Sequence, residues 1–258
     1  MPSSATPRRK KPEPPRARPG RPRKEAAAGG AAPALGPDRI RRQALELIDA
    51  KGLAAFNIRE LAAALGVFPA AVYWHVPSRD ALLSGVIALA LEDVAAAVPA
   101  GSWQLRLRAL LQAFRGALRR HPQLAPLVAN ELAYNAAFDE PLLDQVVGAL
   151  EDARFEGDAL VDAFNVVIAA MCGFATLELS TAPNGAPAEW EAACRAQIDA
   201  VDRAQLPRLG RHIDSLRNRA FLLRWSGGQE QPLESGFEAW IDVLLRGLES
   251  RARALRKR

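Results

Sequence analysis

The side chains with the clearest chemistry in this sequence are cationic, and they are unevenly distributed. Residues 1–30 contain nine Lys and Arg against two Glu, a net charge of +7 in a chain whose total is +5. Groups of this kind bind phosphate oxygens, and no apolar helix face accompanies them that would favour a membrane surface. We therefore expect a polyanionic partner, DNA or RNA more than membrane. A tail that only keeps the chain solvated is the alternative.

Part of this tail has a recognisable pattern. Arg18–Lys24 reads Arg-Pro-Gly-Arg-Pro-Arg-Lys, which resembles an AT-hook. Such a segment lies extended in the minor groove of A·T-rich DNA, where Arg21 and Arg23 would meet a strongly negative potential. Generic charge is the alternative. Residues 1–36 also hold eight of the 19 prolines, so we expect a disordered arm.

Other kinds of chemistry have little support in the sequence. Cys172 and Cys194 have no His at ligand spacing, so we expect reduced thiols in a cytoplasmic protein without metal or cofactor. We find no nucleophile motif, phosphate-binding glycine loop or convincing carboxylate pair, and expect no enzyme and no catalytic residue. The longest nearly apolar run, Val166–Leu177, has 12 residues, whereas a bilayer needs roughly 20. The N-terminus shows no signal peptide, and we expect no membrane association.

The elements that position these residues are helices. Apolar residues recur at helical spacing from Asp38 onward, and no stretch alternates long enough to form a strand, so we predict an all-α fold. Gly52 ends the first helix. Asn57, with Glu60 three residues later, begins the second as a capping box, and Gly66 ends it.

Two further helices follow closely. Pro69 begins a short third helix that stops before Pro77, and Ser78 caps a fourth that continues through Leu91 until Pro99. Two short helices joined by a glycine turn, with another helix before them, form a helix-turn-helix over residues 57–76. The second helix of such a pair must be short and exposed to enter a major groove about 12 Å wide.

Many positions in this region resemble, at fixed spacing, the N-terminal domain of the tetracycline-repressor (TetR) family. The matching segments are Ala44–Ile48, Gly52–Leu53, Asn57–Ala62, Leu65–Val67, Val72–Val76 and Arg79–Leu83. A looser resemblance to the family's C-terminal domain covers His121–Leu127 and Phe237–Asp242. After the Pro-rich arm over 1–36, the resemblance implies a DNA-binding domain over 37–83 and a helical effector-binding and dimerisation domain over 84–258.

The resemblance also implies roles for individual residues. Asn57 stands where the family usually has a Thr cap. The implied DNA contacts are Arg59, Pro69, Ala70, Ala71, Tyr73, Trp74, His75 and Arg79. Tyr73 and Trp74 packing inside a three-helix core is the alternative, as is an ordinary surface role for His75 and Arg79.

The sequence departs from the family pattern at the start of the third helix. Phe68 stands where a small hydroxyl residue commonly caps that helix. Pro69, Ala70 and Ala71 offer no side-chain donor, so they can meet a thymine methyl but cannot bond a base edge. We therefore expect base reading to depend on Arg59, with help from Tyr73 and His75.

The C-terminal region is implied to form a homodimer. The helix over 159–179 and the last helix, 234–255, would pack against their symmetry mates in a four-helix bundle. Gly173, Gly236 and Gly247 would allow close approach. Burial within one chain is the alternative for both helices.

The resemblance further implies a small-molecule effector that releases a palindromic DNA operator. Candidate pocket residues are Phe114, Phe138, Phe164, Met171 and Trp190, and a plain core role is the alternative for each. No His lies between His75 and His121, so tetracycline held by a fourth-helix His is not expected. An activator, or an AT-hook-dependent architectural DNA-binding protein without effector, are the alternative functions.

Overall fold

The computed structural model describes residues 35–128, 140–179 and 187–257. Throughout these ranges the chain forms helices, turns and loops, with no strand. The predicted all-α fold is therefore confirmed. Residues 35–258 belong to one compact unit.

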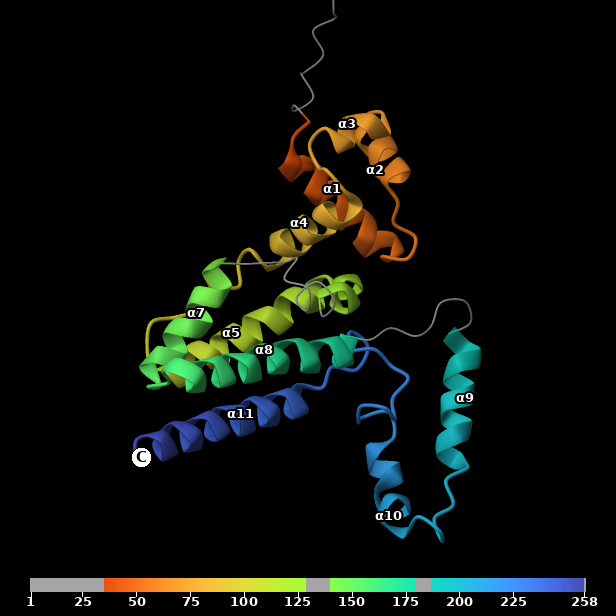
Figure 1. The fold of residues 1–258 in the computed structure, drawn as a ribbon. Coiled ribbons are helices and arrows are strands. Elements are labelled where there is room, and N and C mark those ends of the chain that lie inside the picture. Colours follow the sequence, from red (N-terminus) through yellow and green to blue (C-terminus); the bar gives the residue numbers. More distant parts are fainter. Residues whose placement is uncertain (1–34, 129–139, 180–186, 258) are drawn as a thin grey trace, which may run out of the picture. The chain divides into compact units, whose positions relative to one another are not determined.

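The helices are shown in chain order in Figure 1. They are α1 (Pro37–Lys51), α2 (Ile58–Leu65), α3 (Pro69–Tyr73), α4 (Arg79–Leu91), α5 (Trp103–Arg120), the 3₁₀ turn η1 (Pro122–Leu124), α7 (Glu140–Asp152), α8 (Gly157–Leu179), α9 (Pro187–Asp199), α10 (Pro207–Leu216) and α11 (Glu234–Leu255).

The ends of the first four helices follow from residue chemistry. Gly52 and Gly66 end α1 and α2 with φ of 82° and 70°, a region that glycine adopts without steric cost. The Ser78 hydroxyl accepts a backbone N–H of the first turn of α4 at 3.0 Å. That helix ends at Leu91 rather than at Pro99, because the chain continues in turns over residues 92–97.

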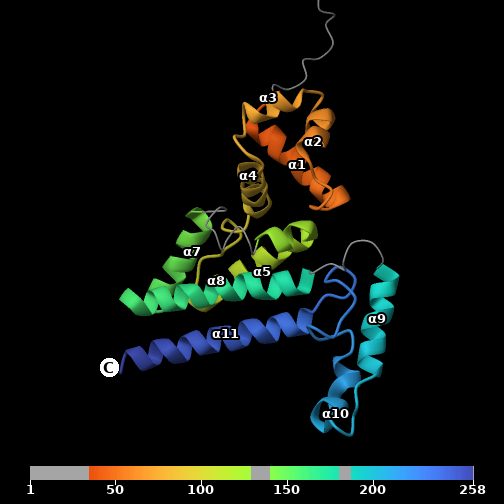
Figure 2. The same cartoon turned by 45° about the vertical axis from the view of Figure 1, so that its right-hand side comes forward.

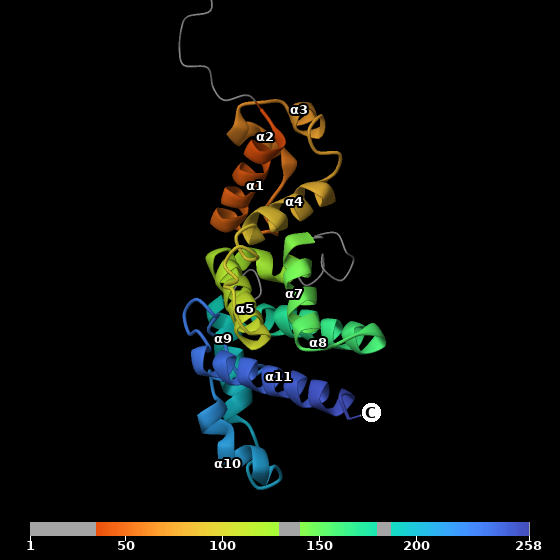
Figure 3. The ribbon, with the colours of Figure 1, turned by 90° about the vertical axis from the view of Figure 1, so that its left-hand side faces the viewer.

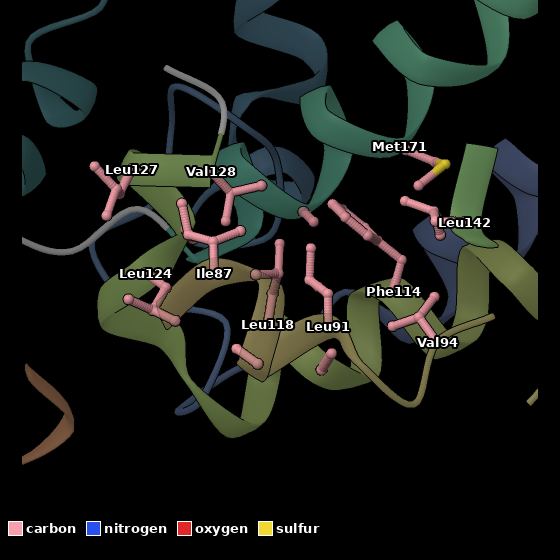
Figure 4. Packing of buried hydrophobic residues seen from close by; sticks show 14 of the residues in the cluster. Ile87, Leu91, Val94, Phe114, Leu118, Leu124, Leu127, Val128, Leu142 and Met171 are labelled. Carbon is pink, nitrogen blue, oxygen red and sulfur yellow. The ribbon is translucent and has the colours of Figure 1, made fainter. Parts of the chain in front are cut away.

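A hydrophobic core joins α4 to the helices that follow it. Figure 4 shows Ile87 and Leu91 of α4 beside Phe114 and Leu118 of α5, with Met171 of α8 beyond them. All five side chains are buried. Helix α4 therefore packs directly on α5, and α5 in turn packs on α8.

A buried ion pair fixes α5 against α8. The Arg115 guanidinium donates to both carboxylate oxygens of Glu178 at 2.6 Å, and the two side chains are 6% and 0% exposed. Arg115 also reaches Glu234 at 2.6 Å and lies 4.3 Å above the Phe237 ring, which brings in the start of α11. Burial alone would lower the pKa of Arg115, but bonds and charges from Glu178 and Glu234 outweigh it and raise that pKa.

Helices α8 and α11 lie side by side and antiparallel (Figures 1 and 2). At one end the rings of Phe174 and Phe237 are 5.1 Å apart, and at the other Arg251 pairs with Asp162 at 2.6 Å. By length and composition alone α8 could cross a bilayer, which is weak evidence for a single helix, because core helices of soluble proteins pass the same test. Only 28% of its most apolar stretch is buried within the chain.

Helices α9 and α10, which periodicity did not predict, form a projecting pair of helices (Figure 3). Ile198 and Ile213 are their buried apolar side chains. An ion pair between Arg203 and Asp214 at 3.0 Å holds the connection to α10.

Replacing Glu178 by Gln tests the buried pair. We expect Glu178→Gln to lower the free energy of unfolding by about 3 kcal/mol, because Arg115 keeps its charge in a buried site and loses a matching anion. Urea denaturation at fixed protein concentration measures this. The matched control is Glu249→Gln, which removes an exposed α11 pair with Arg253 and should cost about 0.5 kcal/mol or less. Equal losses for the two variants would refute the argument.

Candidate nucleic-acid interface

The start of α2 is fixed by Asn57. Its side-chain oxygen accepts the Glu60 backbone N–H at 2.9 Å, which satisfies one of the unpaired donors of the first turn. The second half of the predicted capping box takes a different form. The Glu60 carboxylate pairs with Lys51 of α1, so it ties α2 to α1 across the glycine-ended loop.

The short helix α3 presents its aromatic residues to solvent. Val72 points inward and is 1% exposed, whereas Tyr73 is 49% and Trp74 88% exposed. His75 is exposed as well. The alternative in which Tyr73 and Trp74 fill a three-helix core is therefore wrong, because Val72 occupies that position and the chain turns the two aromatic rings away from it.

The first turn of α3 is poor in hydrogen-bond donors, as its residue types predict. Pro69 and Ala70 are exposed and Ala71 is half-buried. Phe68 makes no side-chain cap bond and is 84% exposed. Sequence reasoning treated Phe68 only as a lost cap and missed its exposure. It extends the apolar surface of this turn beyond the three residues named from the sequence.

The two helices adjacent to α3 in the chain each carry an exposed arginine. Arg59 lies exposed in the first turn of α2, and Arg79 is the first residue of α4. The guanidinium of Arg79 lies 6.0 Å above the ring of Phe56, at the limit of a cation–π contact, which orients it toward the loop before α2. The structure thus places exposed cations and aromatic groups on three consecutive helices, a combination suited to phosphate and base contacts.

Direct contacts connect this region to the helices that follow it. Nδ1 of His121, at the end of α5, lies 2.7 Å from the Asp49 carboxylate of α1. Both side chains are about a quarter to a third exposed. Together with the packing of α4 on α5, this gives α5 two separate contacts with the first four helices.

The remaining sequence-predicted residues fall in several environments. Arg21, Arg23 and Phe138 lie outside the described residues. Phe114 and Met171 are 1% and 3% exposed and form part of the packed core in Figure 4. Phe164 is half-buried against that core, and Trp190 of α9 lines a separate cavity. A pocket role for these residues stays a prediction.

Two cavities lie near the start of α11. A groove of about 740 Å³ runs along an aromatic wall of Phe174 and Phe221, whose rings meet edge-on at 5.1 Å, with Asn218 and Gln231 as polar groups on its lining. A smaller cavity of about 150 Å³ shares Phe221 with this groove. Neither was predicted from the sequence, because the 217–233 segment that lines both has no helical period.

Other site chemistry is limited in the described parts of the chain. Burial raises the pKa of the Cys172 thiol to about 11, so this group is protonated at neutral pH and a poor nucleophile. Cys194 is also a free thiol. Among the described residues, no group of three or more His, Cys, Asp or Glu side chains could hold a metal ion.

Comparison with known sequences identifies the family. Residues 40–86 match the profile of bacterial regulatory proteins of the tetR family, and residues 96–251 match the profile of the tetracyclin repressor-like C-terminal domain. The chain belongs to the tetR family. The second match alone covers more than half of the chain, so the TetR assignment extends well beyond the helix-turn-helix.

Curated relatives match this chain over less than half of their own length. An HTH-type transcriptional regulator of Saccharopolyspora erythraea is 31% identical over 99 residues, which is 38% of this chain and 42% of the relative. The class D tetracycline repressor protein of Escherichia coli is 40% identical over 84 residues, 30% of this chain and 37% of the relative. The matched stretches thus span less than half of these relatives.

Solved TetR structures cover far more of the chain. A "possible TetR family transcriptional regulator" from Streptomyces coelicolor A3(2) superposes with a TM-score of 0.65 at 25% identity, over 83% of this chain and 98% of that one. ActR of S. coelicolor, solved with actinorhodin, superposes with a TM-score of 0.62 at 21% identity, over 84% of this chain and 98% of that one. BioQ, solved with its double-stranded DNA operator, superposes with a TM-score of 0.54 at 19% identity, over 84% of this chain and 99% of that one. The last two show the shared fold.

The Asn57 cap offers a direct test of this local structure. We expect Asn57→Ala to lower the free energy of unfolding by about 1 kcal/mol, because the Glu60 N–H loses its acceptor. Asn57→Ser keeps an acceptor at the same position and should cost only a few tenths. Thermal unfolding of the two variants beside the wild type measures the difference. An Ala variant as stable as the Ser variant would contradict the role of this cap.

Proposed function

We propose that this TetR-family chain is a transcriptional repressor that binds a palindromic operator as a homodimer and is released by a small-molecule effector. It would act in the cytoplasm, with residues 37–83 as its DNA-binding domain and 84–258 as its effector and dimerisation domain. The observation that carries the proposal is the exposure of Tyr73 on α3 and of Trp74 and His75 in the turn after it. The helices before and after this segment carry the exposed Arg59 and Arg79.

The exposed aromatic groups are the strongest support for DNA binding. Phe68 and Trp74 are 84% and 88% exposed. Contact of such large apolar side chains with water is unfavourable, and burying them against a partner lowers the free energy of the complex. A donor-poor first turn can lie close to thymine methyl groups, while Arg59 supplies the bidentate contact that reads a guanine. Arg79 and the arm would then bind phosphates.

The dimer proposal rests on surface left uncovered within the chain. On α11 a stripe at helical spacing contains Gly236, Trp240, Val243 and Gly247, and Val243 is 73% exposed. On α8 the exposed stripe includes Val166 and Gly173. A Cβ added at Gly173 or Gly247 would meet no atom within 4 Å, so a second copy has room to approach closely. Two recognition helices could then reach half-sites about one DNA turn apart.

Effector action would run through the contacts of α5. A ligand that favours one arrangement of α5 and α8 shifts α4 through the core and α1 through the Asp49–His121 contact. Its differential affinity for the two arrangements sets how far operator binding falls. The structural relative solved with actinorhodin is consistent with a regulator that binds an organic molecule. The relative solved with its operator is consistent with DNA binding.

Footprinting of the DNA upstream of this protein's own gene tests the function. We expect a protected palindrome, and Arg59→Gln should weaken binding about tenfold and relax preference at one base pair. Arg79→Gln should weaken binding to all sequences equally and reduce the salt slope by about one. Arg211→Gln on α10, at an exposed position, is the matched control and should change neither. No specific protection by the wild type would overturn the proposal.

The same assay addresses the arm. We expect deletion of residues 1–30 to weaken operator binding and to flatten its dependence on salt, because fewer counterions are released when nine cations are removed. If the arm prefers the minor groove, the loss is greater for operators with A·T-rich flanks than for G·C-rich ones. An unchanged salt slope would show that the arm does not touch DNA.

The dimer surface can be tested by one charge. We expect Val243→Glu to give a folded monomer, about half the mass of the wild type by light scattering after gel filtration, because the carboxylate cannot be buried between two copies. Operator affinity should fall with it. Ala64→Glu places the same charge on an exposed position of α2 and should leave the mass unchanged. A Val243→Glu dimer would exclude this face.

A further inference from the structure

The smaller cavity is built from the end of α8, the start of α9 and the segment before α11. Its volume is about 150 Å³. The apolar wall is formed by Leu177, Trp190, Phe221, Leu222 and Trp225. The polar lining is formed by Glu178, Arg224 and Ser226. A partly open cavity with a mainly apolar and aromatic wall and a few polar groups has the composition of a small-molecule site.

The segment that forms this cavity is held in place by Asn218. Its side-chain oxygen accepts the backbone N–H groups of Trp225 and Ser226, each at 3.1 Å. Its amide nitrogen donates to the Ser226 hydroxyl at 3.2 Å and to Gln231 at 3.0 Å. The backbone of Asn218 is left-handed, with φ of 53°, a conformation that Asn tolerates better than most residues. The wall is therefore formed before any ligand enters.

Arg224 is the group in this cavity whose bonding is incomplete. Its Nε donates to the Ser226 carbonyl at 2.9 Å and its Nη2 to the Gln231 carbonyl at 2.7 Å. Its Nη1 is buried and has no hydrogen-bond partner among the described residues. A buried donor without an acceptor costs free energy, and a ligand oxygen would remove that cost.

The nearest buried carboxylate is already occupied. Glu178 accepts two bonds from Arg115 and the Leu233 backbone N–H at 2.8 Å. Glu178 and the exposed Glu230 attract Arg224, but desolvation is the larger effect and lowers the pKa of Arg224. Neither carboxylate bonds to it in the described contacts. The site therefore retains unsatisfied positive character and favours an anion.

A second cation strengthens this charge. The Arg195 guanidinium lies 4.6 Å above the ring of Trp225, on the wall of the cavity. Arg195 is also paired with Glu191 of the same helix, so its contribution at the cavity is smaller than that of Arg224. Arg224 and the aromatic residues line the same cavity, so flat apolar surface and positive charge occur together there.

The size of the cavity limits what can fill it. Apolar cavities of about 150 Å³ hold a single benzene ring. We propose that this cavity binds a monocyclic aromatic carboxylate, with its ring between the aromatic walls and its carboxylate on Arg224. As an effector subsite this deepens the proposed function and rests on it. As a binding site it depends only on the cavity and on the unpaired Nη1 donor of Arg224.

Calorimetric titration of the full-length protein with benzoate tests the site. We expect saturable binding with a Kd of about 1 mM or tighter. Benzyl alcohol, which keeps the ring and lacks the charge, should bind at least about tenfold more weakly, the change expected for one charge-assisted hydrogen bond. Cyclohexanecarboxylate, which keeps the charge and lacks the flat ring, should also bind more weakly. Absence of benzoate binding to the wild type would overturn the proposal.

Two variants locate the binding. Arg224→Gln should weaken benzoate at least about tenfold and leave benzyl alcohol unchanged. Arg219→Gln is the matched control, since Arg219 is exposed on the same segment and lines the larger groove instead. Because Arg224 also holds two carbonyls, Trp190→Ala provides a test that keeps those bonds, and it should weaken benzoate and benzyl alcohol together. Wild-type affinity in both variants would show that benzoate binds elsewhere.

Operator binding is measured separately, so the two proposals fail in different ways. Benzoate that binds the wild type and lowers operator affinity, with both effects lost in Arg224→Gln, supports an effector subsite. Benzoate that binds without changing operator affinity supports the site and overturns its regulatory role. If the wild type without ligand bound no operator, that result would count against the proposed function. It would not affect the calorimetric result for benzoate.

Discussion

The buried pair between Arg115 and Glu178 is the interaction on which the arrangement of the C-terminal helices depends. Two charges removed from water are tolerated only when every donor and acceptor around them is used. Here Glu178 accepts two Arg115 bonds and the Leu233 N–H, and Arg115 adds Glu234. That requirement sets α5, α8 and the start of α11 relative to one another within hydrogen-bond distances, a stricter condition than apolar packing imposes.

The consequences of this constraint extend in both directions along α5. Toward its C-terminal end, His121 meets Asp49 of α1. Toward its N-terminal end, Arg108 pairs with Glu238 of α11 at 2.7 Å and with Asp242. A single rigid helix thus connects the proposed DNA-binding region with a proposed dimer helix. A ligand placed near Glu178 would act at the point where these connections meet.

Much of the fold could be predicted because it depends on local chemistry. Gly52 and Gly66 end helices through positive φ, Asn57 and Ser78 begin them through side-chain acceptors, and α11 occupies the predicted 234–255. The sequence could not show that Phe68 and Trp74 face solvent, because a five-residue helix is too short for a period to distinguish its faces. The pair of helices α9 and α10 was missed because their few apolar residues form no long stripe.

The pairing of distant residues was also beyond the reach of the sequence. Glu178 reads as one acidic residue at the end of an apolar helix, and its partner lies 63 positions earlier. The Asn218 network depends on a left-handed backbone that no local motif announces. For Glu178 the deciding factor is desolvation by residues far away in the chain, which alters the energy of a polar group without leaving a pattern around it.

The weakly buried face of α8 carries a consequence for the lifetime of the protein. A protomer without its proposed mate presents a long apolar surface to water, with only 28% of its most apolar stretch covered. Surfaces of this kind are bound by chaperones and expose a chain to proteolysis. At low concentration newly made chains would then be degraded before they dimerise. They would accumulate only when their concentration is high enough for dimers to form.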